Sequence, residues 1–192
     1  MASLFKTTFN TRWLPTGDHR YIRTDYPGEL TDEEIQWLRD NNVLTVVDLR
    51  KEEEYSKLPC RLENEKGFTY YHLPVSGGDV VPKTPQDIID AYLFMIDEQL
   101  DNIVDTILNA KTGVIYFCAS GKDRTGVTSA AILRRLGFDD KTIIDDYMIS
   151  RANLIEYVQP YLKEYPDLLE RFIMPEEIYI KEALKKIDKL FK

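Results

Sequence analysis

Short apolar runs alternate with helix-type segments along most of the chain, and this alternation limits the possible folds more than any other feature. Residues 43–49, VLTVVDL, are rich in β-branched side chains, and residues 114–117, VIYF, are a second apolar run; both predict buried strands. Residues 68–74 predict a further strand that ends at Pro74. Strands that alternate with helices favour a mostly parallel central sheet flanked by helices, so we expect an α/β fold.

Helix signals occupy the segments between and after these runs. Residues 31–42 begin with Thr31 and have Glu34 three positions later, the capping-box pattern of a helix start. Apolar residues recur at helical spacing over 84–110, after a Thr-Pro pair, which predicts one long helix. Residues 125–137 predict another helix, which a terminal glycine ends.

The length of the chain, 192 residues, suits a single compact domain. We expect one domain over residues 1–192, with a core at about 10–155 and a helical carboxyl-terminal cap at about 156–192. Hydrophobic residues make up 43% of the chain, which is enough for a sizeable core. The formal net charge of −8 argues against broad binding to nucleic acid or to an anionic membrane surface.

The chain has two cysteines, Cys60 and Cys118, too few for a disulfide framework. No apolar stretch is long enough for a signal peptide or a membrane span, so we expect a protein of the reducing cytoplasm. Cys60, next to a proline, is interpreted as a small apolar filler of the core. The alternative is that Cys60 forms a reversible disulfide with oxidised Cys118.

Residues 117–126, FCASGKDRTG, lead from the last predicted strand into the following helix. Cys118 comes directly after the strand, and five residues separate it from Arg124. The amino end of a helix binds anions, and a short loop containing Gly121 can turn its amides inward around a tetrahedral oxyanion. Arg124 can hold two oxygens of that anion, and cysteine reacts as a thiolate, which a positive field stabilises. This loop therefore suits attack of sulfur on phosphorus.

The pattern of cysteine, five residues, arginine and threonine resembles the signature of the cysteine-dependent protein tyrosine and dual-specificity phosphatases. The string GKDRTG is similar to the bacterial tyrosine phosphatase family, which includes lipid-directed members. Four other segments agree with this resemblance: YIRTD at 21–25, LTDEEIQWL at 30–38, TVVDLRKEEE at 45–54 and DDYMIS at 145–150. The resemblance covers about residues 10–155. The residue before the cysteine is usually histidine in this family, and here it is Phe117.

The resemblance implies a role for each residue of the loop. Cys118 would be the nucleophile, Arg124 would bind phosphate and stabilise the transition state, and Thr125 would hydrogen-bond the departing sulfur. The amides that bind phosphate would be those of Ala119, Ser120, Gly121, Lys122, Asp123 and Arg124. Lys122 would also add positive charge at the rim of the pocket; the alternative is a solvated surface lysine.

The leaving oxygen needs a proton, and two aspartates are candidates for the general acid. Asp123 lies in the loop itself, and relatives with GKDR use this residue. Asp79 lies in the loop after the strand at 68–74, where dual-specificity phosphatases that this chain resembles carry their acid. We rank Asp123 first because it lies within reach of the leaving group. The alternatives are a carboxylate that holds the loop, for Asp123, and a turn residue, for Asp79.

The predicted function is hydrolysis of phosphate monoesters through a phosphocysteine intermediate, by a protein tyrosine or dual-specificity phosphatase. The substrate would be a phosphorylated protein, and inorganic phosphate or a similar anion would occupy the loop. A phosphoinositide phosphatase is the alternative enzyme, and a phosphate-binding module without turnover is the alternative of another class. No cofactor is needed, and no metal is expected because His19 and His72 lack ligand spacing.

Three features outside the loop are given structural interpretations. His72, in a predicted strand, is interpreted as a hydrogen-bonded structural residue. Arg50 is interpreted as one half of an ion pair at the end of a strand. The acidic run at 52–54 is interpreted as the solvated start of a helix.

Overall fold

A five-stranded sheet lies at the centre of the computed structural model, which describes residues 3–77, 82–164 and 174–191, apart from the side chains of 160–162. The strands are β1 (Arg12–Trp13), β2 (Tyr21–Thr24), β3 (Val43–Asp48), β4 (Thr69–His72) and β5 (Gly113–Phe117). They are arranged in the order β1-β2-β5-β3-β4, and only β1 pairs antiparallel to its neighbour. The predicted α/β class with a mostly parallel sheet is therefore confirmed.

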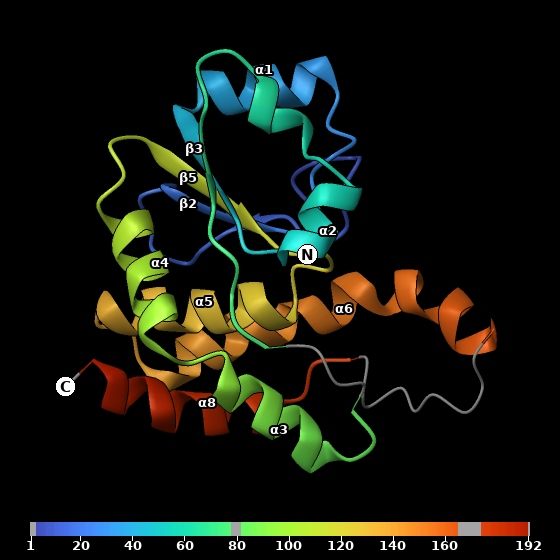
Figure 1. Cartoon of the computed structure of the whole chain (residues 1–192), viewed down its shortest axis with the longest axis vertical. Coiled ribbons are helices and arrows are strands. Elements are labelled where there is room, and N and C mark those ends of the chain that lie inside the picture. The colour runs from blue at the N-terminus through green and yellow to red at the C-terminus, as the bar shows by residue number, and fades with distance from the viewer. Residues whose placement is uncertain (1–2, 78–81, 165–173, 192) are drawn as a thin grey trace.

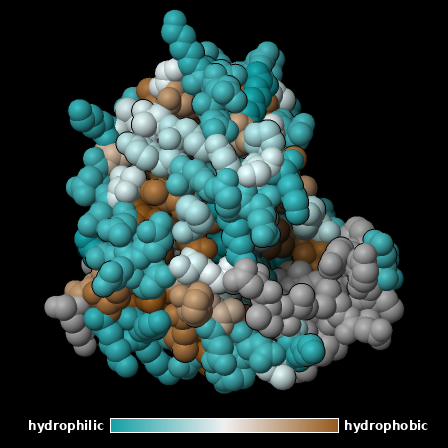
Figure 2. All heavy atoms as spheres, in the orientation of Figure 1, coloured by the Kyte–Doolittle hydropathy of each residue, from teal (hydrophilic) through white to brown (hydrophobic). Residues whose placement is uncertain are grey.

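Helices cover both faces of this sheet (Figure 1). One face carries α1 (Asp32–Asp40), and the chain also forms the short helix α2 (Glu52–Lys57) and the 3-10 turn η1 (Arg61–Asn64) between β3 and β4. The other face carries α3 (Pro85–Phe94), α4 (Glu98–Leu108), α5 (Asp123–Arg135), α6 (Asp140–Glu164) and α8 (Glu177–Leu190). Hydrophilic side chains cover most of the surface seen in Figure 2, with hydrophobic groups between them in its middle and lower part.

The local signals place α1, β3, β4, β5 and α5 correctly, whereas β1, β2 and η1 were not predicted. The Thr31 side chain accepts a hydrogen bond from the Glu34 amide, and the Glu34 carboxylate accepts one from the Thr31 amide, so the predicted capping box starts α1. The runs at 43–49 and 114–117 are strands β3 and β5, whose side chains are almost all buried because helices cover both faces.

The single long helix predicted over 84–110 is wrong, because the chain breaks between α3 and α4. The Asp97 carboxylate accepts a hydrogen bond from the Leu100 amide at 3.0 Å and another from the Ser76 hydroxyl at 2.7 Å. Asp97 is therefore an N-cap that starts a new helix, and the apolar spacing continues across the break without showing it. The turn sets the direction of α3, which lies beside the predicted phosphate loop.

The carboxyl-terminal helices belong to the same packing as the sheet. The helix α6 runs through residue 155, where we expected the core to end. The helix α8 packs against α3, α5 and α6, and its residues Ile180, Leu184 and Ile187 lie in the core cluster that also holds Cys118. No described helix is both long and apolar enough to cross a membrane.

A buried ion-pair network joins the first two strands to α6. Arg12 Nε lies 2.9 Å from Asp146 Oδ1, and the Arg23 guanidinium is paired with the other carboxylate oxygen. All three side chains are at least 96% buried. Burial alone would raise the pKa of Asp146, but the charges of Arg23 and Arg12 outweigh it, so the pKa lies below its ordinary value. One carboxylate is thus the shared counter-charge of two buried guanidinium groups.

Replacing Asp146 by asparagine is expected to destabilise the protein by about 3–5 kcal/mol, because two guanidinium groups lose their buried counter-charge. The matched control is Asp145→Asn, since Asp145 pairs with Lys141 at an exposed position where an ion pair contributes little. Denaturant unfolding at neutral pH measures both. Because the pKa of Asp146 is lowered in the folded state, its contribution is lost as pH falls below the ordinary value of 3.8. Equal stabilities for the two variants would contradict this account.

Candidate active site

The loop that follows β5 lies at the carboxyl edge of the sheet. Cys118 comes directly after Phe117, the last residue of β5, and α5 begins at Asp123, two residues earlier than the sequence predicted. The neighbouring parallel strands β2 and β3 end at the same edge. Ligands of open α/β folds bind at this edge, so the loop has the position expected of a site.

The carbonyl groups of the loop are bonded away from its centre. The Ala119 carbonyl accepts from the Tyr26 amide at 3.0 Å, and the Asn10 side chain donates to the Ser120 carbonyl at 3.3 Å. The Gly121 carbonyl accepts from Asn10 at 3.0 Å and from Arg23 Nη2 at 2.9 Å. In a trans peptide the N–H points opposite to the C=O, so these contacts turn the following amides toward the inside of the loop. Amide N–H groups that point into the loop can bind an anion there.

Gly121 is required by the backbone itself. Its φ angle is +64°, a conformation that favours glycine. A Cβ atom here would lie 2.5 Å from the Asp25 nitrogen and 2.6 Å from the Thr24 oxygen. The loop therefore packs against the end of β2 more closely than any side chain allows.

Arg124, in the first turn of α5, is held by Glu54 of α2. Both terminal nitrogens of the guanidinium donate to the carboxylate, with Nη2 2.9 Å from Oε1. Hydrogen bonds from Arg124 lower the pKa of Glu54 below its ordinary value. Burial alone would lower the pKa of Arg124, but the bonds to Glu54 and the charge of Cys118 raise it, so the guanidinium stays charged.

Asp123 is held by a tyrosine of α3. The Tyr92 hydroxyl donates to Asp123 Oδ1 at 2.6 Å, and the Tyr147 hydroxyl of α6 lies 2.6 Å from that of Tyr92. Lys122 Nζ lies 3.1 Å from the same carboxylate oxygen. One oxygen of Asp123 therefore receives both contacts.

Two further groups of the loop are buried. Cys118 is 1% exposed, and the Thr125 hydroxyl is buried with no hydrogen-bond partner among the described residues. An orphaned buried hydroxyl is costly, and it fits a donor whose acceptor is present only at one stage of a reaction. A cavity of about 430 Å³ lies beside the end of the loop, at Lys122, Asp123 and Arg124, and neither Cys118 nor Thr125 lines it. It is lined by Lys51, Glu53, Glu54, Pro82, Ile88, Ala91, Tyr92, Met95, Lys122, Asp123 and Arg124.

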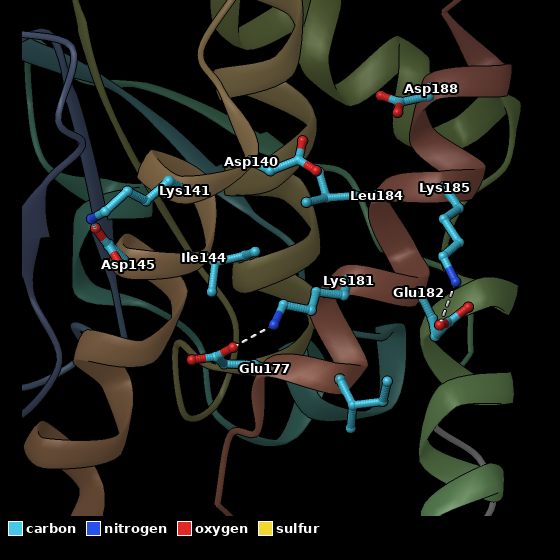
Figure 3. A pocket seen from close by; sticks show the side chains of 11 residues that line it. Asp140, Lys141, Ile144, Asp145, Glu177, Lys181, Glu182, Leu184, Lys185 and Asp188 are labelled. Atoms are coloured by element: carbon cyan, nitrogen blue, oxygen red, sulfur yellow. Dashed lines mark hydrogen bonds and ion pairs between the residues drawn. The ribbon is translucent and has the colours of Figure 1, made fainter.

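A second hollow, of about 590 Å³, lies between α6 and α8 (Figure 3). Several charged side chains along it pair with one another, among them Lys181 with Glu177 and Lys185 with Glu182. None of the predicted site residues lines it. In the described part of the chain, no three or more His, Cys, Asp or Glu side chains gather where they could hold a metal ion.

The structure thus places every predicted residue of the loop around one edge of the sheet, and their catalytic roles stay predictions. Asp79, the alternative acid, lies outside the described residues. Lys122 is 7% exposed and contacts Asp123, so the solvated-lysine interpretation is wrong. Phe117, in place of the usual histidine, is fully buried, and its ring faces the Arg50 guanidinium at 5.3 Å.

The interpretations outside the loop are confirmed in part. Arg50 pairs with Asp48 at the end of β3, and His72 Nε2 lies 2.8 Å from the Arg50 carbonyl oxygen. Cys60 is buried in a cluster separate from that of Cys118, and burial raises its pKa to about 11, which agrees with a filler.

The interpretation of the acidic run at 52–54 is correct for Glu52 and Glu53, which are exposed, and wrong for Glu54. The sequence analysis also did not identify Tyr92 as a residue that contacts the loop. A signal for Glu54 existed, since it follows β3 at the same sheet edge as Cys118. Nothing in the sequence indicates that Tyr92 contacts the loop.

The fold is that of the tyrosine phosphatase-like α/β proteins. It is similar to the structure of PTPMT1 in complex with PI(5)P, with a TM-score of 0.51 and 13% identity over 95% of this chain and 97% of that one. It is also similar to a mutant form of Tk-PTP, with a TM-score of 0.51 and 18% identity over 94% and 97% of the two chains. The chain belongs to the tyrosine phosphatase family, whose sequence profile matches residues 8–192.

One curated relative is a tyrosine-protein phosphatase of Nostoc commune, 26% identical over 140 residues. The match covers 68% of this chain, and the chain spans about half the length of that relative, 48%. The core catalytic domain of the PP-IP phosphatase SIW14 from S. cerevisiae shares the fold with a TM-score of 0.50 and 16% identity. The match covers 73% of this chain and 75% of the SIW14 chain.

Replacing Gly121 by alanine is expected to abolish anion binding by the loop, because the new Cβ collides with backbone atoms at the end of β2. Gly137→Ala is the matched control, since Gly137 has a φ angle of +86° and a Cβ atom added there would meet nothing within 4 Å. Both variants lose about 1–2 kcal/mol from the unfavourable φ. Only Gly121→Ala should lose vanadate binding, measured by calorimetry. Equal vanadate affinity in both variants would show that the close approach does not shape the loop.

Proposed function

We propose that this chain hydrolyses phosphate monoesters through a cysteine–phosphate intermediate on Cys118. The observation that carries the proposal is the outward bonding of three successive loop carbonyls, between Cys118 at the end of β5 and Arg124 at the start of α5. This leaves a nucleophile, inward amides and a charged guanidinium around one point. Membership of the tyrosine phosphatase family supports the same reaction.

In the first step, the Cys118 thiolate attacks phosphorus, an S–P bond forms and the P–O bond to the leaving group breaks. The electron pair of that bond stays on the leaving oxygen, which takes a proton from Asp123. In the second step, water attacks the phosphocysteine, its proton goes to the Asp123 carboxylate and the S–P bond breaks. The orphaned Thr125 hydroxyl supplies a hydrogen bond to the departing thiolate.

Arg124 can stabilise the transition state without leaving Glu54. A guanidinium has five N–H donors, and the contacts with Glu54 use one from each terminal nitrogen. Among the described residues no hydrogen bond uses the remaining donors, which can bond the equatorial oxygens of the phosphoryl group. Glu54 fixes the plane of the guanidinium, which reduces the entropy lost when the anion binds.

The cavity beside the loop favours an aryl phosphate such as phosphotyrosine. Ile88 and Ala91 of α3, with Met95 directly after that helix, form an apolar wall for a ring. The charged lining consists of the cations Lys51, Lys122 and Arg124 and the carboxylates Glu53, Glu54 and Asp123. Equal numbers of the two signs suit a substrate with one phosphate group better than an inositol lipid with several.

A substrate panel tests this preference. Phosphotyrosine peptides are expected to have a higher kcat/KM than matched phosphoserine peptides and than dispersed phosphoinositides, because the apolar wall contacts the ring. The variant Ala91→Glu, which puts a further negative charge on that wall, should lower kcat/KM for the phosphotyrosine peptide. A phosphoinositide that outperforms the peptide would instead support the lipid phosphatase alternative.

Replacing Cys118 by serine is expected to abolish turnover while the loop still binds vanadate, because the amides and Arg124 remain. Rapid-quench mass spectrometry of the unchanged protein should find phosphate on Cys118. The control is Cys60→Ala, which removes the other thiol from a separate part of the core and should keep turnover. A wild-type chain that binds vanadate without any turnover would instead be the phosphate-binding module.

Replacing Asp123 by asparagine is expected to slow the hydrolysis of phenyl phosphate by about 10²–10⁴, because a poor leaving group needs the proton. Hydrolysis of nitrophenyl phosphate, an activated ester, should fall far less. Asp90→Asn is the control, since Asp90 is an exposed residue of α3 bonded to Gln86. If Asp79→Asn shows the selective loss and Asp123→Asn does not, the acid is Asp79. A uniform loss for both substrates would mean that Asp123 only holds the loop.

A further inference from the structure

Two tyrosine hydroxyls form a chain that ends on Asp123. Tyr92, on α3, and Tyr147, on α6, are 2% and 1% exposed, and their rings meet edge to face at 6.2 Å between centroids. The Tyr92 hydroxyl lies 2.6 Å from Asp123 Oδ1 on one side and 2.6 Å from the Tyr147 hydroxyl on the other. Three helices thus meet at one carboxylate.

The direction of each hydrogen bond in this chain follows from counting protons. A tyrosine hydroxyl has one proton to donate, and Tyr92 donates it to Asp123. The bond between the hydroxyls must therefore run from Tyr147 to the Tyr92 oxygen. Burial raises the pKa of both tyrosines well above the ordinary value, and the charge of Asp123 adds to it. Both hydroxyls stay protonated at neutral pH, so Tyr92 always acts as a donor.

The two oxygens of Asp123 have different surroundings. Oδ1 receives the Tyr92 hydroxyl and lies 3.1 Å from Lys122 Nζ. Among the described residues, no hydrogen bond reaches Oδ2. Asp123 lines the cavity, and its side chain is 34% exposed although Tyr92 covers it on the Oδ1 side. Oδ2 is therefore the oxygen available to a substrate.

We propose that Tyr92, supported by Tyr147, is a positioning residue that holds the Asp123 carboxyl group with Oδ2 toward the leaving oxygen. The inference rests on the proposed function, in which Asp123 is the general acid. A proton on Oδ1 would compete with the donors already there, so the acid carries its proton on Oδ2. After Oδ2 gives this proton to the leaving oxygen, the same contacts at Oδ1 stabilise the new carboxylate.

The orientation of the Asp123 carboxyl group matters in both steps of the reaction. Oδ2 donates a proton when the P–O bond breaks, and it accepts one from water when the S–P bond breaks. The carboxyl group belongs to the first residue of α5 and can rotate about its own side-chain bonds. Without Tyr92, the carboxyl group samples orientations in which neither oxygen reaches the leaving group, and a displacement of this kind costs rate but not binding.

The test is Tyr92→Phe, which keeps the ring and its packing and removes the hydroxyl. For phenyl phosphate, kcat is expected to fall about 10- to 100-fold with KM unchanged. For nitrophenyl phosphate, kcat should fall less than about threefold, because this leaving group needs little protonation. Tyr147→Phe should show the same selectivity with a smaller loss, since Tyr92 still reaches Asp123.

The matched control is Tyr116→Phe. Tyr116 is also a fully buried tyrosine, and its hydroxyl lies 2.7 Å from Ser129 of α5, the helix that carries Asp123. This variant loses an equally buried hydrogen bond to the same helix, and it should change both substrates in equal proportion. Thermal unfolding of each variant confirms that it is folded.

A double variant separates positioning from packing. In the Asp123→Asn background, Tyr92→Phe should cause no further loss with phenyl phosphate, because the group that it positions no longer supplies a proton. A crystal structure of Tyr92→Phe with vanadate should show the Asp123 carboxyl group rotated away from the anion. A loss that is equal for both substrates, or that adds fully to Asp123→Asn, would overturn the proposal. If Asp123→Asn itself shows no leaving-group selectivity, the assignment of the acid fails instead.

Discussion

Arg23 is bonded on one side to Asp146 and on the other to the carbonyl of Gly121, and the geometry of the loop depends on this buried guanidinium. A cation without a partner would not remain in a position with no exposure to water, so Asp146 of α6 is needed to keep it there. The same carboxylate pairs with Arg12, which donates to Asn10, a residue that holds two loop carbonyls. The predicted phosphate loop is thus held in shape by charged residues far from it in sequence.

A second ion pair acts on the loop from the cavity side. Glu54 orients Arg124, and both residues face the space into which a phosphate would bind. The two systems differ in their surroundings, since the pair under the loop is fully buried and Glu54 is one-third exposed, at 34%. The buried pair therefore contributes to folding, and the exposed one contributes to the order of a single side chain.

The low identity to solved structures shows that very different sequences form this fold. Chains only 13% and 18% identical to this one share its fold over almost the whole length. A parallel sheet covered by helices needs buried apolar strands, and many sequences provide these. The contact between Tyr92 and Asp123 is more specific, because it depends on the hydroxyl group of one side chain of α3.

The sequence by itself determined several of the elements and the position of the loop, and the chemistry of the loop stays a prediction. The capping box of α1, the apolar runs of β3 and β5, and the string from Cys118 to Thr125 are local patterns, and each was predicted with its position. The tertiary structure alone decided the partners of these residues. Glu54 lies 70 residues from Arg124 and Tyr92 lies 31 residues from Asp123, and periodicity says nothing about contacts over such separations. The break before α4 was missed for another reason: its N-cap, Asp97, is a local signal, but the apolar spacing continues across the break.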